Sequence, residues 1–290
     1  RVVYAPSRYF SSEPKADVSL ILRNPKAMDS ARNQVMFALN DYLAGLALDQ
    51  LSNQASVGGI SFSTNANNGL MVNANGYTQR LPQLFQALLE GYFSYTATED
   101  QLEQAKSWYN QMMDSAEKGK ALEQAIMPAQ MLSQVPYFSR DERRKILPSI
   151  TLKEVLAYRD ALKSGARPEF MVIGNMTEAQ ATTLARDVQK QLGADGSEWC
   201  RNKDVVVDKK QSVIFEKAGN STDSALAAVF VPTGYDEYTS SAYSSLLGQI
   251  VQPWFYNQLR TEEQLGYAVF AFPMSVGRQW GMGFLLQSND

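Results

Sequence analysis

The sequence contains no histidine and a single cysteine, Cys200. Without histidine the chain cannot build a His-based zinc site, a Ser-His-Asp triad or a Cys-His pair, and one cysteine cannot replace the missing groups. A single cysteine also cannot form a disulfide within the chain. We therefore predict that the chain, acting alone, binds no catalytic metal and is not itself a hydrolase.

The chain also lacks an excess of basic residues and long apolar runs. Its 27 Lys and Arg against 30 Asp and Glu give a net charge of −3, whereas nucleic-acid binding needs clustered positive charge. Asp141 and Glu142 interrupt the basic cluster at 140–145, as is typical of a solvated helix face. No apolar run approaches the roughly 20 residues needed to cross a bilayer. The sequence predicts a soluble chain with neither a nucleic-acid nor a membrane partner.

The remaining composition is that of globular protein, and 290 residues are enough for one large domain or two of ordinary size. Alternating residues predict strands at 16–23, 60–63, 70–73, 169–176 and 226–231. Helical spacing and three capping boxes predict helices at 30–51, 79–96, 98–118, 122–132, 151–162 and 177–192 and one ending near 258. Residues 1–15 are expected to be irregular. The mixture, with hairpins, indicates an α+β fold with mostly antiparallel or mixed sheets packed with helices.

The polar segment 193–210 has no sustained helical period and indicates a domain boundary. We expect a complete α+β domain at 1–198, a linker at 199–211, and the start of a second, homologous domain at 212–290 that is truncated. The chain begins without methionine and stops just after a strand-like segment, so we expect it to be a fragment of a longer protein.

An internal repeat supports two related domains. A shift of 208 positions, which carries Val18 onto Leu226, aligns the strand at 18–22 and the helix that follows it with later residues of similar character. The same shift carries Gly58 onto Gly266 and Phe62 onto Phe270. Such self-similarity indicates duplicated domains.

The two copies differ in their reactive side chains. Under the same shift Arg260 falls on Ser52 and Tyr267 falls on Gly59. Packing requires the apolar and glycine positions in both copies, whereas chemistry requires a reactive residue only once. The repeat therefore selects Arg260 and Tyr267 as candidate functional residues.

These two residues belong to the segment 254–271, where the apolar period changes from helical to strand-like near Gly266. A helix that enters a strand through a glycine places a cation and a phenol at the rim of a sheet, where sites are commonly built. Each residue also has a structural interpretation. Arg260 would be a surface cation that compensates a helix C-terminus, and Tyr267 a half-buried strand tyrosine. The adjacent acidic pair at 262–263 is assigned no chemistry, because neighbouring helix residues point about 100° apart.

The run Leu-Arg-Thr-Glu-Glu-Gln-Leu-Gly-Tyr at 259–267 resembles the signature of the C-terminal half of the pitrilysin and insulinase family of zinc metallopeptidases. The resemblance implies two bowl-like halves that close around peptides or small proteins, and a periplasmic location. It implies a zinc bound by an inverted His-x-x-Glu-His helix on the N-terminal half of the same polypeptide, outside this chain. Tyr267 would then be catalytic, donating a hydrogen bond to the oxyanion, and Arg260 would bind substrate by holding a carbonyl.

A second function remains open, in which the fold serves a non-catalytic assembly or chaperone-like subunit. The presence of both Arg260 and Tyr267 argues against this alternative. The motif that decides between them would lie upstream of Arg1.

Overall fold

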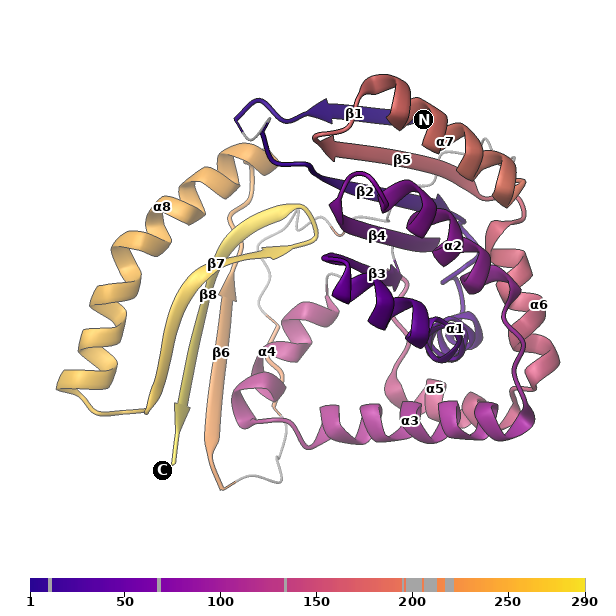
Figure 1. Ribbon diagram of the computed structural model, residues 1–290. Helices are drawn as coiled ribbons and strands as arrows, with labels where there is room; N and C mark the ends of the chain where they lie inside the picture. The colour runs from indigo at the N-terminus through magenta and orange to yellow at the C-terminus, as the bar shows by residue number, and fades with distance from the viewer. Residues whose placement is uncertain are drawn as a thin grey trace. The chain divides into compact units, whose positions relative to one another are not determined.

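The computed structural model describes residues 1–9, 12–66, 69–132, 135–194, 196, 205, 213–216 and 222–289. The chain forms two compact units (Figure 1). The first unit consists of Arg1–Gln111 and Phe138–Arg201, and the second of Met112–Tyr137 and Asn202–Asp290. The predicted linker at 199–211 and Cys200 lie outside the described residues, apart from Val205.

The first unit is built on a five-stranded mixed sheet. Its strands are β1 (Val2–Pro6), β2 (Lys15–Arg23), β3 (Ile60–Ala66), β4 (Gly69–Tyr77) and β5 (Arg167–Gly174). The strand order is β1-β5-β2-β4-β3. Only the β1–β5 pair within it is parallel. The sheet confirms the predicted α+β class.

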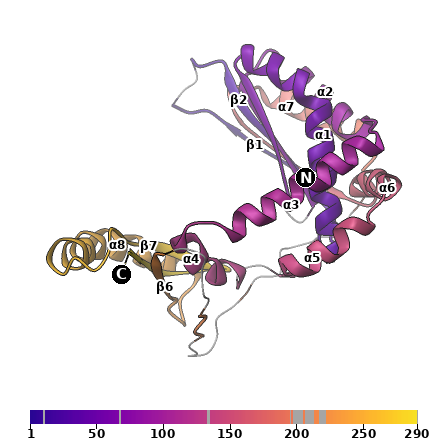
Figure 2. The same ribbon diagram turned by 90° about the horizontal axis from the view of Figure 1, so that it is seen from below.

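The helices of the described first-unit residues pack either on this sheet or against the helix at 31–57, which itself contacts the sheet. They are α1 (Ala31–Val57), α2 (Leu81–Ser94), α5 (Arg140–Ile146), α6 (Leu152–Lys163) and α7 (Glu178–Leu192), with a 3₁₀ turn at Leu147–Ser149. Helix α3 (Glu99–Glu117) contains residues of both units. Figure 2 shows α1, α2 and α7 on the same side of the sheet. Phe85 of α2 meets Phe170 of β5 edge to face, over the fully buried Leu20 of β2.

Strand β1 differs from the irregular segment expected at 1–15. Its residues pair with β5 in parallel register, Val2 opposite Phe170, across more than 160 positions of sequence. Val2 and Val3 are both exposed at this sheet edge. The sequence here therefore lacks the alternation of apolar and polar residues by which a half-buried strand is predicted. The prediction for these residues was wrong because the strand is specified by a distant partner.

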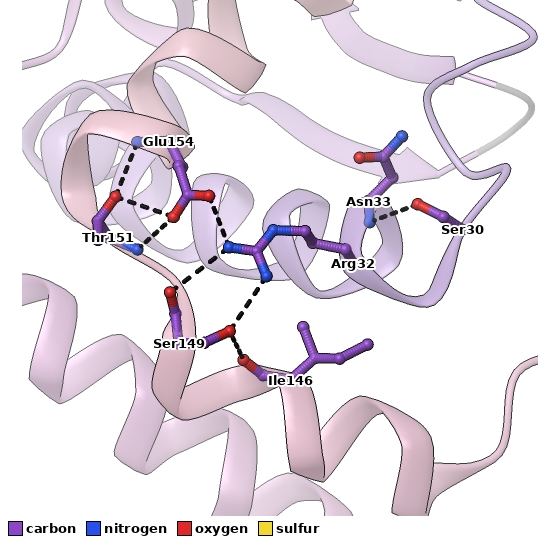
Figure 3. Close-up of polar contacts among 7 residues, drawn as sticks. All are labelled: Ser30, Arg32, Asn33, Ile146, Ser149, Thr151 and Glu154. Atoms are coloured by element: carbon purple, nitrogen blue, oxygen red, sulfur yellow. Dashed lines mark hydrogen bonds and ion pairs between the residues drawn. The ribbon is translucent and has the colours of Figure 1, made fainter.

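Helix α1 is fixed to the start of α6 by a polar cluster (Figure 3). Arg32 donates to Ser149 Oγ at 3.1 Å and to Glu154 Oε1 at 2.5 Å. Glu154 also accepts from the backbone N–H and the hydroxyl of Thr151, completing the capping box of α6. These bonds stabilise the ionised carboxylate, and the backbone bond from Thr151 is the main reason that the pKa of Glu154 is lowered to about 2.

The lowered pKa of Glu154 predicts an acid-dependent contribution to stability. A carboxyl whose pKa is lower in the folded than in the unfolded chain contributes fully above its ordinary pKa of 4.5 and loses that contribution as the pH falls toward 2. We expect Glu154→Gln to unfold at lower urea concentration than the wild type at pH 7, and this difference to shrink between pH 4.5 and 3. Glu103→Gln, which removes a more exposed carboxylate paired with Lys106, is the control. A Glu154→Gln difference that does not change with pH would contradict the expectation.

The second unit contains an antiparallel three-stranded sheet. Its strands are β6 (Ser224–Phe230), β7 (Ala268–Val276) and β8 (Gln279–Ser288), in the order β6-β8-β7. Helix α8 (Glu237–Tyr256) lies along β7 and β8, and its Phe255 packs against Phe284. Helix α4 (Ala121–Met131) packs against β6 and β8, which is why Met112–Tyr137 belongs to this unit. That segment departs from the expected division, in which all of 1–198 formed one domain.

The two units share the strand arrangement that the repeat predicts. In each, a strand leads through a long helix to a hairpin, and the second hairpin strand lies between the other two. The order β2-β4-β3 thus corresponds to β6-β8-β7, with antiparallel pairing throughout. The two units therefore have the same strand order over these three strands.

The gap-free alignment of the copies is wrong beyond α8. On β3 the helix-facing side carries Ile60, which is buried, and Thr64, which donates to Asp41 of α1. On β7 the side beneath α8 carries Val269 and Ala271, both buried, whereas Phe270 is 46% exposed. Neighbouring strand residues point to opposite faces. Phe62 therefore lies on the same face as Ile60 and Thr64, whereas Phe270 lies on the face opposite to Val269 and Ala271. The two phenylalanines are not equivalent, and the shift that relates β3 to β7 differs from 208 by an odd number.

The three consecutive aromatic residues at the end of α8 are not all part of the core. Phe255 faces Phe284, but Trp254 is 66% exposed and Tyr256 is 44% exposed. Successive helix residues point about 100° apart, so three in a row cannot all face one sheet. In the described ranges, no helix has the length and apolar composition to cross a membrane.

Candidate functional site

The candidate site lies where α8 passes into β7. Helix α8 does not stop at Tyr256 but continues as a π-helical stretch, Asn257–Glu262. Gln264 then adopts a left-handed conformation with φ of 55°, which reverses the chain. The sequence predicted a helix entering a strand through glycine, and the structure adds the π turn and the strained residue. Both features are common at functional positions.

Gly266 allows the start of β7 to approach β8 closely. A Cβ atom at this position would lie 2.5 Å from the carbonyl oxygen of Gln287, so a side chain there would force the two strands apart. The next backbone N–H, that of Tyr267, donates to the same carbonyl at 3.0 Å. This close approach fixes the backbone of Tyr267 at the sheet edge.

Arg260 extends from the π-helical stretch toward the corner where the chain turns at Gly266 into β7. Its Nη1 donates to the carbonyl oxygen of Gly266 at 3.1 Å. The bond holds the guanidinium beside the residue that precedes Tyr267, and Arg260 is exposed. Arg260 therefore contacts the backbone next to Tyr267, whereas the phenol hydroxyl bonds to other side chains.

Tyr267 is 47% exposed, and its hydroxyl belongs to a three-residue polar cluster. The hydroxyl donates to Asp223 Oδ2 at 2.5 Å and accepts from Gln287 Nε2 at 2.6 Å. The Gln287 amide also donates to Asp223 Oδ2, at 2.8 Å. Gln287 comes from β8, and Asp223 directly precedes β6, so all three strands of the sheet contribute at this edge.

The cluster shifts the protonation equilibria of both titratable members. The hydrogen bond to the Asp223 carboxylate is the main reason that the pKa of Tyr267 is raised, because it favours the protonated phenol. The same bond, with that from Gln287, lowers the pKa of Asp223. At neutral pH the cluster therefore consists of a neutral phenol and an ionised carboxylate.

Sequence reasoning missed Asp223 and Gln287. They lie 44 and 20 positions from Tyr267, and no short motif joins them. One signal was available, since the 208-residue shift carries Asp223 onto Lys15, a residue of opposite charge. In the first unit Lys15 lies opposite Tyr77 on β4, with its Nζ over that ring.

The described part of the chain holds no cluster of side chains that fits a zinc ion. Among the residues that the structure describes, no three His, Cys, Asp or Glu side chains gather in a way that could hold a metal. A guanidinium, a neutral phenol and a carboxylate of lowered pKa can bind and polarise a carbonyl group. They supply neither a strong general base nor an activated nucleophile.

Comparison with known proteins places both parts of the chain in one family. Residues 1–146 match the model of the middle or third domain of peptidase M16, and residues 149–290 match the model of the peptidase M16 inactive domain. Strand β5 lies in the second of these matches, but it pairs with β1 and β2, which lie in the first. The boundary between the two matches therefore falls within the first structural unit.

Individual relatives agree with this match. The chain is 99% identical to Protease 3 of Escherichia coli (strain K12) over 100% of this chain and 30% of that protein. It is 22% identical to the insulin-degrading enzyme of Homo sapiens over 84% of this chain and 25% of that protein. The crystal structure of pitrilysin matches with a TM-score of 0.96 and 99% identity, over 100% of this chain and 31% of that one. The chain thus spans about 30% of the length of Protease 3.

The family matches agree with the resemblance carried by residues 259–267. They cover nearly the whole chain in two consecutive segments. Because the match to the middle-domain model alone spans residues 1–146 of 290, more than half, the chain belongs to the peptidase M16 family.

Proposed function

We propose that this chain is part of the C-terminal half of a zinc metalloendopeptidase that encloses and hydrolyses peptides and small proteins. The observation that carries the proposal is the corner formed by Arg260 and Tyr267, held together through the Gly266 carbonyl. Neither the shift of 208 nor one that is a single residue longer or shorter brings an arginine or a tyrosine of the first unit onto these two positions. Only one copy of the fold therefore carries this pair.

In the proposed reaction Tyr267 donates a hydrogen bond to the oxyanion that develops on the substrate carbonyl. A neutral phenol suits this role, and the raised pKa keeps it neutral over a wide pH range. Arg260 binds a second carbonyl of the substrate backbone through its remaining N–H groups, since a guanidinium carries five donors and uses one on Gly266.

Zinc and the general base belong, in this proposal, to the N-terminal half of the same polypeptide, because this chain has no histidine and one cysteine. That half is the first partner of the chain, and a peptide or small protein is the second. We also propose a periplasmic location, which rests on the resemblance to the family alone.

The proposal is tested on the full-length protein that contains this chain, with residues 1–290 alone as the comparison. We expect the full-length protein to bind zinc and to cleave peptides in a chelator-sensitive manner, and residues 1–290 to do neither. Stoichiometric zinc and chelator-sensitive cleavage by residues 1–290 would overturn the proposal. A full-length protein that binds peptides without cleaving them would instead support the assembly or chaperone-like alternative.

A further inference from the structure

We propose that Asp223 and Gln287 are positioning residues for Tyr267, which together hold its hydroxyl at the edge of the β6-β8-β7 sheet so that it can serve the developing oxyanion. This inference rests on the proposed function. It adds two residues that lie outside the segment 254–271 and that act through the phenol rather than on the substrate.

The hydroxyl of Tyr267 is held from two sides. Asp223 accepts its hydrogen at 2.5 Å, and Gln287 donates to its oxygen at 2.6 Å. A tyrosine that is 47% exposed would otherwise be free to rotate about its side-chain bonds. Two bonds to separate strands restrict the ring to one orientation.

Gln287 is a buried residue. It is only 5% exposed, and its amide donates to both Asp223 and Tyr267. A buried amide with satisfied donors is a rigid anchor, because breaking its bonds would leave polar groups unpaired. Asp223 thus orients the amide, and the amide in turn orients the phenol.

The two copies of the repeat also differ at the position of Asp223. In the first unit Lys15 takes this position, and its Nζ lies over the ring of Tyr77 from β4. In the second unit the carboxylate of Asp223 accepts a hydrogen bond from Tyr267, which precedes β7. A carboxylate is thus present in the unit that carries this tyrosine, and a cation replaces it in the other unit.

The arrangement also defines what changes during turnover. A phenol has one hydrogen to donate, and in this structure it points to Asp223. When an oxyanion forms, rotation about the C–O bond moves that hydrogen from Asp223 to the substrate, while Gln287 continues to donate to the phenol oxygen. Asp223 retains its bond from Gln287 and stays ionised.

The test uses the full-length protein and a fluorogenic peptide. Displacement of a catalytic group by about 1 Å can cost up to roughly 100-fold in rate, so we expect Asp223→Ala to lower kcat by roughly 10-fold with a smaller change in KM. Gln287→Met should act in the same direction. Asp223→Asn, which keeps an acceptor oxygen, should lose less than Asp223→Ala. Glu237→Ala, which removes a carboxylate from the start of α8, is the matched control.

The decisive comparison is made in the Tyr267→Phe background. If Asp223 acts through the phenol, Asp223→Ala should lower kcat no further there. If Asp223→Ala has its full effect in that background, the positioning proposal is overturned.

A second measurement does not depend on activity. With 3-fluorotyrosine incorporated at position 267, the ¹⁹F resonance reports ionisation of this one phenol. The charged groups next to it are Asp223 and, through the Gly266 carbonyl, Arg260. We expect Asp223→Ala to lower the midpoint of the ¹⁹F titration, and an unchanged midpoint would refute the contact. If Tyr267→Phe retains wild-type turnover, the proposed role of Tyr267 fails, whereas the ¹⁹F titration still decides whether the contact exists.

Discussion

Tyr267→Phe in the full-length protein should fold, bind zinc as the wild type does, and turn over about 10²–10³ times more slowly. The substitution removes only the hydroxyl, which in our proposal donates to the oxyanion. An interaction that forms in the transition state and not with the bound substrate changes kcat and leaves KM nearly constant. Single-turnover kinetics with a peptide substrate would measure the chemical step directly.

The matched control for this variant is Tyr256→Phe, because Tyr256 is a similarly exposed tyrosine at the end of α8. It loses the same atom from the same unit and should keep wild-type kcat. Wild-type turnover in Tyr267→Phe, measured where chemistry limits the rate, would mean that the hydroxyl serves the structure only. The hydrogen bonds to Asp223 and Gln287 would then be its whole role.

Arg260→Ala should lower kcat/KM by roughly 10- to 150-fold and, unlike Tyr267→Phe, should raise KM. A hydrogen bond to a charged group contributes about 1.5–3 kcal/mol, and binding of a substrate carbonyl is already formed before the transition state. Part of the loss should come from release of the Gly266 carbonyl, which Arg260 holds at 3.1 Å. Steady-state kinetics over a range of peptide concentrations would separate KM from kcat.

Two further variants sharpen this result. Arg260→Lys keeps the charge but not the planar set of donors, so it should recover only part of the activity. Arg278→Ala removes a cation that pairs with Glu237 near the opposite end of the β7–β8 hairpin, and it should leave KM unchanged. An equal effect of Arg278→Ala and Arg260→Ala would attribute the loss to net charge rather than to substrate binding.

The sequence was most informative where structure depends on nearby residues. The capping boxes at Thr151 and Thr177 located the starts of α6 and α7 correctly, because the bonds that begin each helix lie within four residues. The strand at 16–23 was found within one residue, because its inward side chains alternate and are fully buried. Local signals of this kind do not depend on the rest of the fold.

Features that depend on distant partners were missed. Strand β1 is an exposed edge strand that only its pairing with β5 defines. Asp223 precedes β6 and Gln287 lies near the end of β8, and the antiparallel pairing of these strands brings both residues to Tyr267 only after the sheet has formed. Of the candidate site, sequence reasoning identified the cation and the phenol, since the repeat and the 259–267 motif both contain them, but not the groups that orient the phenol.

The odd offset between the two copies has a consequence for the repeat as a whole. Strand pairing relates Leu20 to Thr64 through Val72, and Ala228 to Ala271 through Phe284, so β2 and β6 differ by 208 positions whereas β3 and β7 differ by 207. A change of one residue between a helix and the strand that follows exchanges the two sets of side chains on that strand, while its backbone pairing need not change. A duplicated fold can in this way expose a different half of an existing strand and place new side chains at its rim, with its buried architecture retained.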